Sequence, residues 1–172
     1  MAEDEGNITS ENLSATDGNG ADTGPQIGML NQYIKDLSVE NPNAPDSFGW
    51  ESQPQVDVQV NIQVNNVTEE VSEVVMTLGV KASVDEGVQF NVELDFATLF
   101  GLRNIDDEQA HPFLFGEAPR LIFPFARRVV ADAIRDAGFP PLVLEPIDFN
   151  QLYVQQREQA AQMAEEQPAG EA

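Results

Sequence analysis

The chain has 172 residues, and 30 Asp and Glu against 8 Lys and Arg give it a formal net charge of −22. This length is typical of a single domain, and a hydrophobic content of 41% excludes a fully disordered chain. Such an acidic surface repels nucleic acid and anionic membranes, whereas it attracts basic segments of other proteins. The absence of cysteine excludes disulfides and thiolate metal sites.

The two ends of the chain are acidic and poor in large apolar residues. We therefore expect disordered tails over residues 1–27 and 164–172, on either side of one domain over residues 28–163. The N-terminus lacks the basic start and apolar run of a secretion signal, and no stretch is long and apolar enough to span a bilayer. The sequence predicts a cytoplasmic protein with no direct membrane insertion.

Four segments of the first half have the pattern of strands. Residues 56–64, 74–84 and 88–96 alternate strictly between apolar and polar side chains. This alternation predicts an antiparallel sheet with one face on a core and the other in water. The link at residues 85–87 predicts a hairpin, and residues 33–39 form a weaker fourth strand.

The second half has the periodicity of helices. A long helix is predicted over residues 118–137, with Pro119 near its start and Gly138 after its end. A last helix is predicted from Asp148, with Gln151 as its capping partner. Strands followed by helices indicate an α+β fold. The long helix is apolar over more than one stripe, which predicts a second copy of the chain on its far side.

The residues that could carry catalysis or bind a cofactor are few. There is no glycine-rich phosphate loop, and His111 has no second His or Cys with which to hold a metal. The acids at Asp106, Asp107 and Glu108 could in principle serve acid–base chemistry. Because a chain with 30 acidic residues contains such clusters by chance, we interpret this one as a charged turn or a helix start. A hydrolase with paired carboxylates would need two acids in unlike environments, and no spacing marks such a pair. We expect a protein-binding protein without enzymatic activity or cofactor.

Three segments, taken together and in order, are more specific than composition. They are residues 33–45 (YIKDLSVENPNAP), 121–127 (LIFPFAR) and 138–149 (GFPPLVLEPIDF). With their spacing, they closely resemble the bacterial protein-export chaperone family SecB over residues 32–159. The resemblance implies a four-stranded antiparallel sheet with helices, assembled as a homotetramer that is a dimer of dimers. It also implies a chaperone that holds precursor proteins unfolded and passes them to the export motor SecA.

The resemblance further implies two sets of binding residues. Acidic residues on the outer sheet face would meet SecA, and these are Asp36, Glu40 and Glu93. Aromatic residues would line the surface for unfolded clients, or could equally be plain core, and these are Phe48, Trp50, Phe139, Phe149 and Tyr153.

The chain departs from the family pattern at residues 95–98, where many relatives carry polar residues and a Gly-Gly pair. A chaperone of the same fold that serves another partner, such as an antitoxin-stabilising relative, is the closest alternative function. A toxin–antitoxin pair beside the gene would favour that alternative.

Overall fold

The computed structural model describes residues 23–166, which form a sheet followed by helices. In chain order the elements are β1 (Gln26–Glu40), η2 (Asp46–Gly49), β2 (Gln55–Thr68), β3 (Val71–Val84), β4 (Gly87–Arg103), α1 (Asp107–Pro112), η3 (Phe113–Glu117), α2 (Ala118–Asp136) and α3 (Phe149–Glu166). The predicted strands and both predicted helices are present. The α+β class is therefore confirmed.

The four strands form one antiparallel sheet in the order β1-β4-β3-β2. The two hairpins β2–β3 and β3–β4 are joined by short turns, and β1 pairs with β4 on the far side. The strands β1 and β2 are consequently the two edges of the sheet, and β4 lies beside β1 in the interior.

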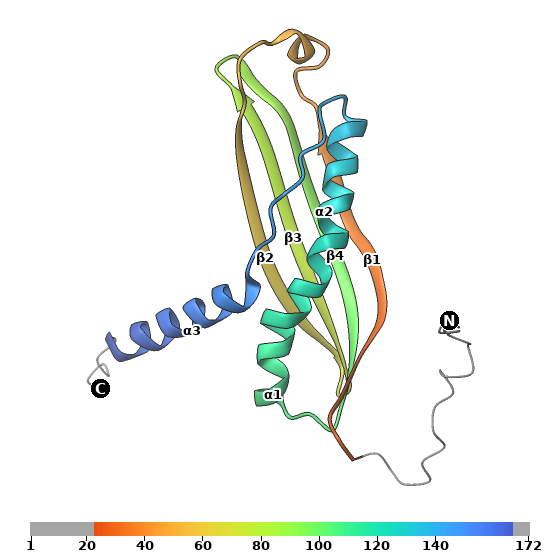
Figure 1. Ribbon diagram of the computed structural model, residues 1–172, viewed down its shortest axis with the longest axis vertical. Helices are drawn as coiled ribbons and strands as arrows, with labels where there is room; N and C mark the ends of the chain where they lie inside the picture. The colour runs from red at the N-terminus through yellow and green to blue at the C-terminus, as the bar shows by residue number, and fades with distance from the viewer. Residues whose placement is uncertain (1–22, 167–172) are drawn as a thin grey trace, which may run out of the picture.

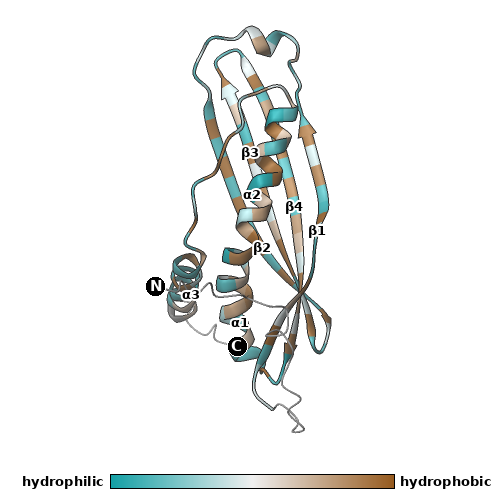
Figure 2. Ribbon diagram, turned by 45° about the vertical axis from the view of Figure 1, so that its right-hand side comes forward, coloured by the Kyte–Doolittle hydropathy of each residue, from teal (hydrophilic) through white to brown (hydrophobic). Residues whose placement is uncertain are grey.

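The core lies between one face of the sheet and α2, which crosses β3 and β4 (Figure 1). Apolar residues alternate with polar ones along the strands (Figure 2), so that most of the apolar side chains share one face of the sheet. The buried residues of this inner face include Met76, Leu78, Val92 and Leu94, and those of α2 include Ile122, Ala126, Val130 and Ile134.

The apolar surface that remains exposed is not the one the sequence suggested. Ala126 and Val130, which widen the apolar face of α2, are fully buried against the sheet. The exposed apolar side chains of α2 are instead Leu121 and Phe125, at 36% and 46%. One helix also leaves the inner faces of both edge strands open, where the exposed residues are Ile34, Leu37, Val39, Val56 and Val58. The subunit thus presents one apolar face over α2 and its two flanks.

The ends of the predicted domain differ by a few residues from the observed elements. The first strand begins at Gln26 and α3 continues to Glu166, so the expected tail boundaries at residues 27 and 164 fall inside regular structure. The remainder of both expected tails lies outside the described residues.

A short helical segment before α2 was not predicted from the sequence. Asp106 accepts a hydrogen bond from the backbone N–H of Gln109 at 2.8 Å, and Asp107 and Glu108 lie in the first turn of α1. These acids therefore start a helix, one of the two plain interpretations of the cluster. Pro112 and Gly116 interrupt the apolar spacing that would have indicated the helix in the sequence.

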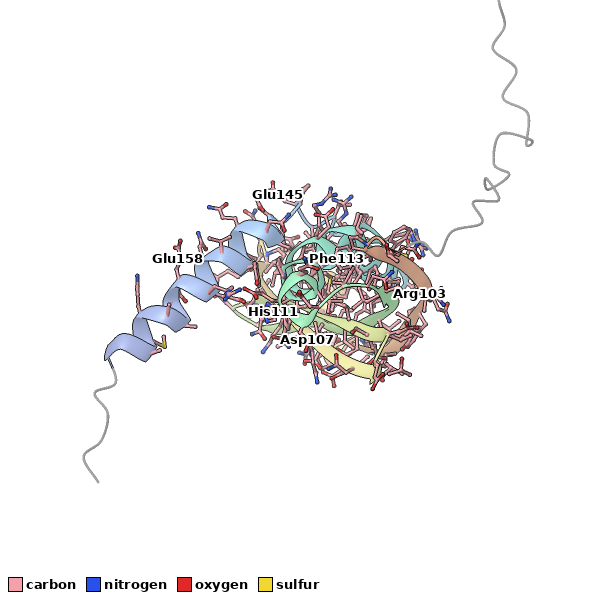
Figure 3. All side chains as sticks on the ribbon, turned by 90° about the horizontal axis from the view of Figure 1, so that it is seen from below. Arg103, Asp107, His111, Phe113, Glu145 and Glu158 are labelled. Atoms are coloured by element: carbon pink, nitrogen blue, oxygen red, sulfur yellow. The ribbon has the colours of Figure 1, made fainter. Side chains whose placement is uncertain are left out.

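The last helix, α3, projects away from the sheet and from α2 (Figures 1 and 3). Its start is capped by Asp148, which accepts a hydrogen bond from the backbone N–H of Gln151 at 2.9 Å, as predicted. The segment before it runs past α2, where Arg127 donates a hydrogen bond to the carbonyl oxygen of Leu144 at 3.1 Å. Tyr153 contacts α1, because its hydroxyl lies 2.8 Å from Nδ1 of His111.

Candidate functional site

The three acids expected to bind a basic partner lie close together on the outer face of the sheet, opposite α2. Ser38 pairs with Glu93, and Asp36 and Glu40 are the outward-facing neighbours of Ser38 along β1. Alternate residues of a strand are separated by roughly 6.6 Å, so Asp36 and Glu40 flank Glu93 on the neighbouring strand. All three side chains are exposed. The alternation pattern therefore placed them correctly relative to one another.

The structure adds Asp95 as a fourth acid, which sequence reasoning did not assign to this site. Asp95 is the cross-strand partner of Asp36 and accepts a hydrogen bond from the hydroxyl of Thr77 at 2.6 Å. Asn91 supports another acid, since its amide donates to the Glu40 carboxylate at 3.4 Å. We call Asp36, Glu40, Glu93 and Asp95 the acidic surface.

A bulge in β1 is needed to bring these acids to the outer face. The register of β1 against β4 shifts by one residue between Ile34 and Asp36. Without the bulge at Lys35, strict alternation along the same residues would put Asp36 on the same face as Ile34, which points to the core side. The bulge allows Tyr33, Lys35 and Asp36 to reach the outer face together.

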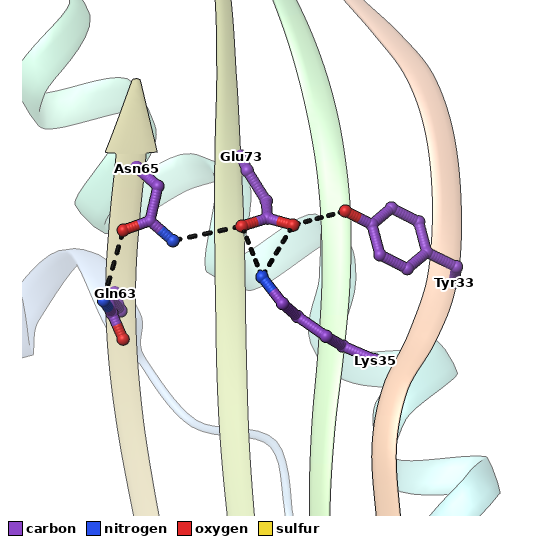
Figure 4. A network of polar contacts seen from close by, with 5 residues as sticks. All are labelled: Tyr33, Lys35, Gln63, Asn65 and Glu73. Carbon is purple, nitrogen blue, oxygen red and sulfur yellow. Dashed lines mark hydrogen bonds and ion pairs between the residues drawn. The ribbon is translucent and has the colours of Figure 1, made fainter. Parts of the chain in front are cut away.

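Beside the acidic surface, a buried carboxylate joins three strands (Figure 4). Glu73 on β3 accepts hydrogen bonds from the Tyr33 hydroxyl, from Lys35 Nζ at 2.8 Å and from Asn65 Nδ2 at 3.0 Å. Tyr33 and Lys35 belong to β1 and reach across β4, while Asn65 belongs to β2. We call these four residues the Glu73 cluster. It ties both edge strands to the centre of the sheet.

The three donors hold Glu73 in its charged form. Hydrogen bonds from Lys35 first, then from Tyr33 and Asn65, lower the pKa of the Glu73 carboxyl from 4.5 to about 2 against the opposing effect of burial. The same contact with Glu73 raises the pKa of the Tyr33 hydroxyl. Glu73 is therefore ionised at any neutral pH.

This depressed pKa predicts a loss of stability in acid that a Glu73→Gln variant lacks. Because the pKa is lower in the folded chain than in the unfolded one, the stabilisation is complete above pH 4.5 and disappears as the pH falls toward 2. Between about pH 5.5 and pH 3, the wild type should lose about 2 kcal/mol more free energy of unfolding than the variant. Urea unfolding of both proteins at the two pH values measures the difference. Equal losses would show that the ion pair is too weak to depress this pKa.

The aromatic residues expected to meet clients are divided between two places. Phe48, Trp50 and Phe139 gather at the end of the sheet where β3 turns into β4. The ring centroid of Phe139 lies 5.2 Å from that of Phe48 and 5.1 Å from that of Phe90. Phe48 is 52% exposed, and Trp50 and Phe139 are partly exposed. We call Phe48, Trp50 and Phe139 the turn-end aromatics.

Glycine is required beside these rings. Gly138 has a φ of +96°, and a Cβ atom there would approach the Phe48 ring to 2.8 Å. Asn41 fixes the same region, because its amide donates to the carbonyl oxygen of Ala137 at 2.8 Å. The loop after β1 is thereby attached to the end of α2, and it leaves the Phe48 ring at the surface.

Phe149 and Tyr153 lie at the start of α3, away from the turn-end aromatics. Phe149 is only 3% exposed and its ring packs against Phe123 at 5.6 Å, so it is a core residue in this structure. Tyr153 is half-buried between His111 and Arg157. The cleft between β2 and α3 that both residues line has a volume of about 130 Å³. That is smaller than the usual ligand pocket and too small for a peptide segment.

The side chain of His111 packs against neighbouring aromatic residues. Its ring stacks on Phe115 at 4.5 Å and contacts the Tyr153 hydroxyl. Within residues 23–166, no group of three or more His, Asp or Glu side chains is arranged to hold a metal ion. None of the helices in the same part of the chain is long and apolar enough to cross a membrane.

Comparison with known proteins places this sheet and these helices in one family. The family model for preprotein translocase subunit SecB matches residues 20–160. The chain belongs to the SecB family. The protein-export protein SecB of Novosphingobium aromaticivorans is 56% identical over 98% of this chain and 99% of its own length. That of Erythrobacter litoralis is 53% identical over 92% of each chain.

A solved structure shares the fold at a greater distance. The SecB-like chaperone of Mycobacterium tuberculosis, in complex with a peptide from an antitoxin, superposes with a TM-score of 0.59 at 16% identity. The match covers 70% of this chain and 90% of that chain. At this identity the likeness shows the SecB fold alone, whereas the closely related sequences support a role as a protein-export chaperone.

Proposed function

We propose that this SecB-family protein holds precursor proteins in an unfolded, translocation-competent state in the cytoplasm and delivers them to the motor SecA. The observation that carries the proposal is the separation of two surfaces on one subunit. Four acids gather on the outer face of the sheet, and exposed aromatic rings gather at one end of it. A carrier that must hold a client and be recognised by a motor at the same time needs two such surfaces.

The acidic surface is the proposed SecA site. Within the described residues, Asp36 and Glu93 have no ion-pair partner, and Glu40 and Asp95 receive only neutral donors. Their negative charge is therefore available to a basic segment of the motor, which it would steer and orient. Asp36, Glu40 and Glu93 are the residues that the family resemblance indicates, and Asp95 extends them.

The turn-end aromatics form the proposed client surface, together with Tyr153 and Phe149 at the far end of the linker, residues 137–148, that joins α2 to α3. Apolar burial is non-directional, so exposed rings suit a binder of many sequences. Phe48 and Trp50 are accessible in this structure. Phe149 becomes accessible only if α3 moves away from Phe123, so we assign it a secondary part.

The exposed apolar face over α2 supports assembly as a homotetramer, a dimer of dimers. Leu121, Phe125 and the inner faces of β1 and β2 are exposed in the single subunit. Exposed apolar side chains gathered on one face often mark protein–protein contacts. A second copy packed on the same face would cover it, since identical subunits commonly associate through self-complementary surfaces.

A refolding experiment tests the chaperone activity and its surface. An unfolded precursor diluted into buffer should be arrested by near-stoichiometric wild-type protein. A Phe48→Ser/Trp50→Ser variant should need about tenfold more protein, because burial of one large aromatic contributes ~1.5–3 kcal/mol. Val67→Ser is the matched control, as Val67 is 56% exposed at the opposite end of the sheet. Equal arrest by all three proteins would place the client surface elsewhere, and no arrest by the wild type would refute the function.

A further inference from the structure

Lys35 precedes Asp36 in the chain, yet its positive charge is held away from the acidic surface. Its Nζ lies 2.8 Å and 3.1 Å from the two carboxylate oxygens of Glu73, two strands away (Figure 4). Resting on the function proposed above, we propose that Glu73 is a positioning residue for the SecA site. By retaining the Lys35 ammonium group, it keeps the acidic surface free of an internal counterion.

The acidic surface would attract that ammonium group if Glu73 released it. Asp36 and Asp95 are direct cross-strand partners, and two like charges in such a pair repel each other. A cation that settled between them would relieve this repulsion. Lys35 is adjacent to Asp36 at the bulge, and its side chain is 47% exposed, so it has room to turn. A lysine has a long flexible stem, which makes this movement easy.

The other basic residues of the described part of the chain are placed less favourably. Lys81 lies on the same outer face, as the cross-strand partner of Asn91 and of Asp57, so it can approach Glu93 but is too far along the sheet to reach Asp36 or Asp95. The arginines lie at the end of β4 or on α2 and α3, where each is paired locally. Lys35 is thus the cation best placed to neutralise the site.

Glu73 is well suited to hold this lysine. Its side chain is only 10% exposed, and it accepts hydrogen bonds from Tyr33 and Asn65 as well. These neutral donors fix the carboxylate in place without competing for its charge. The depressed pKa described above keeps the carboxylate ionised throughout the neutral range. Lys35 therefore has a permanent partner of opposite charge outside the SecA site.

A cycle of three variants separates this electrostatic role from a purely structural one. In Glu73→Gln, the freed Lys35 should pair with Asp36 or Asp95 and weaken SecA binding by about two- to fivefold, the range of one exposed charge pair. In Lys35→Gln/Glu73→Gln, the counterion is absent and SecA affinity should return to that of the wild type. A merely structural Glu73 would give a double variant no better than the single one. Tyr33→Phe is the matched control, because it removes a hydrogen bond from Glu73 and leaves the ion pair.

Affinity should be measured by calorimetry with full-length protein and SecA at low and high salt, since the defect of Glu73→Gln should shrink as salt screens it. A crystal structure of Glu73→Gln supplies a readout that does not depend on SecA. It should show Lys35 Nζ within ion-pair distance of Asp36 or Asp95. If Lys35 stays beside residue 73 or turns to solvent, the inference is wrong even where SecA binds the acidic surface. If Lys35 moves as expected but affinity is unchanged, the acidic surface is not the SecA site and the proposed function itself fails.

Discussion

Reversal of charge at Asp36, Glu40 and Glu93 should severely weaken SecA binding while it leaves client holding mostly intact. The three side chains are exposed neighbours on β1 and β4, so their replacement by Lys leaves the core unchanged. Each change converts an attraction for a basic partner into a repulsion and costs several kcal/mol at a close contact. We expect SecA affinity to fall by at least about 100-fold. Calorimetry with purified SecA measures it, and refolding arrest of a precursor measures client holding.

The matched control for this triple variant is a reversal elsewhere on the same sheet. Asp57 faces outward on β2, the opposite edge strand, so Asp57→Lys adds positive charge without touching the acidic surface. It should retain most of the SecA affinity at physiological salt, where exposed charges are screened within ~8 Å. If the folded triple variant lost both activities, the two binding surfaces would not be separate. If it lost neither, the acidic surface would have no part in recognition.

A charged residue placed on the exposed face of α2 should reduce the proposed tetramer to dimers. Phe125 is 46% exposed in the subunit, and in the proposed tetramer it would be covered by a second copy. An unpaired carboxylate buried in such a contact costs at least several kcal/mol. Phe125→Glu should therefore convert the tetramer into dimers held by the remaining contacts. Light scattering at micromolar concentration should report about half of the wild-type mass.

The control for this variant is Val143→Glu in the linker before α3. Val143 is 65% exposed and lies outside the apolar face over α2, so its replacement should leave the tetramer intact. Both variants should keep the circular dichroism of the wild type, because neither side chain is part of the core. A tetrameric Phe125→Glu variant, or a monomeric wild type, would refute the proposed assembly through α2.

The fold could be predicted from the sequence wherever the alternation was regular. Residues 56–64, 74–84 and 88–96 all lie in strands whose apolar side chains face α2, because period-two alternation specifies a face directly. The long helix could be predicted for the same reason, since its apolar residues recur every three or four positions. The side of that helix that stays exposed could not be predicted, because it depends on how α2 crosses β3 and β4 in the folded chain.

The candidate site was predictable only in part. The family resemblance supplied Asp36, Glu40 and Glu93, but Asp95 joins them through strand pairing that no local pattern encodes. The Glu73 cluster was missed because its members come from three strands and each looks like an ordinary polar position. The two groups of aromatic residues proposed to meet clients could not be told apart from the sequence, since the burial of Phe149 depends on how α3 packs.

The number of residues in β1 between Tyr33 and Asp36 decides whether the Glu73 cluster can form. Side chains of a strand alternate between the two faces of the sheet, so a shift by one position moves a side chain from the core face to the solvent face. The extra residue at Lys35 interrupts this alternation, so Tyr33 and Asp36 both face outward although they are three positions apart. Loss of one residue here would restore regular alternation with Tyr33 and Asp36 still facing outward. The single position left between them would face the core, so no residue there could reach Glu73 as Lys35 does. The second residue between Tyr33 and Asp36 is therefore required for the contact of Lys35 with Glu73, and not for the outward orientation of Asp36.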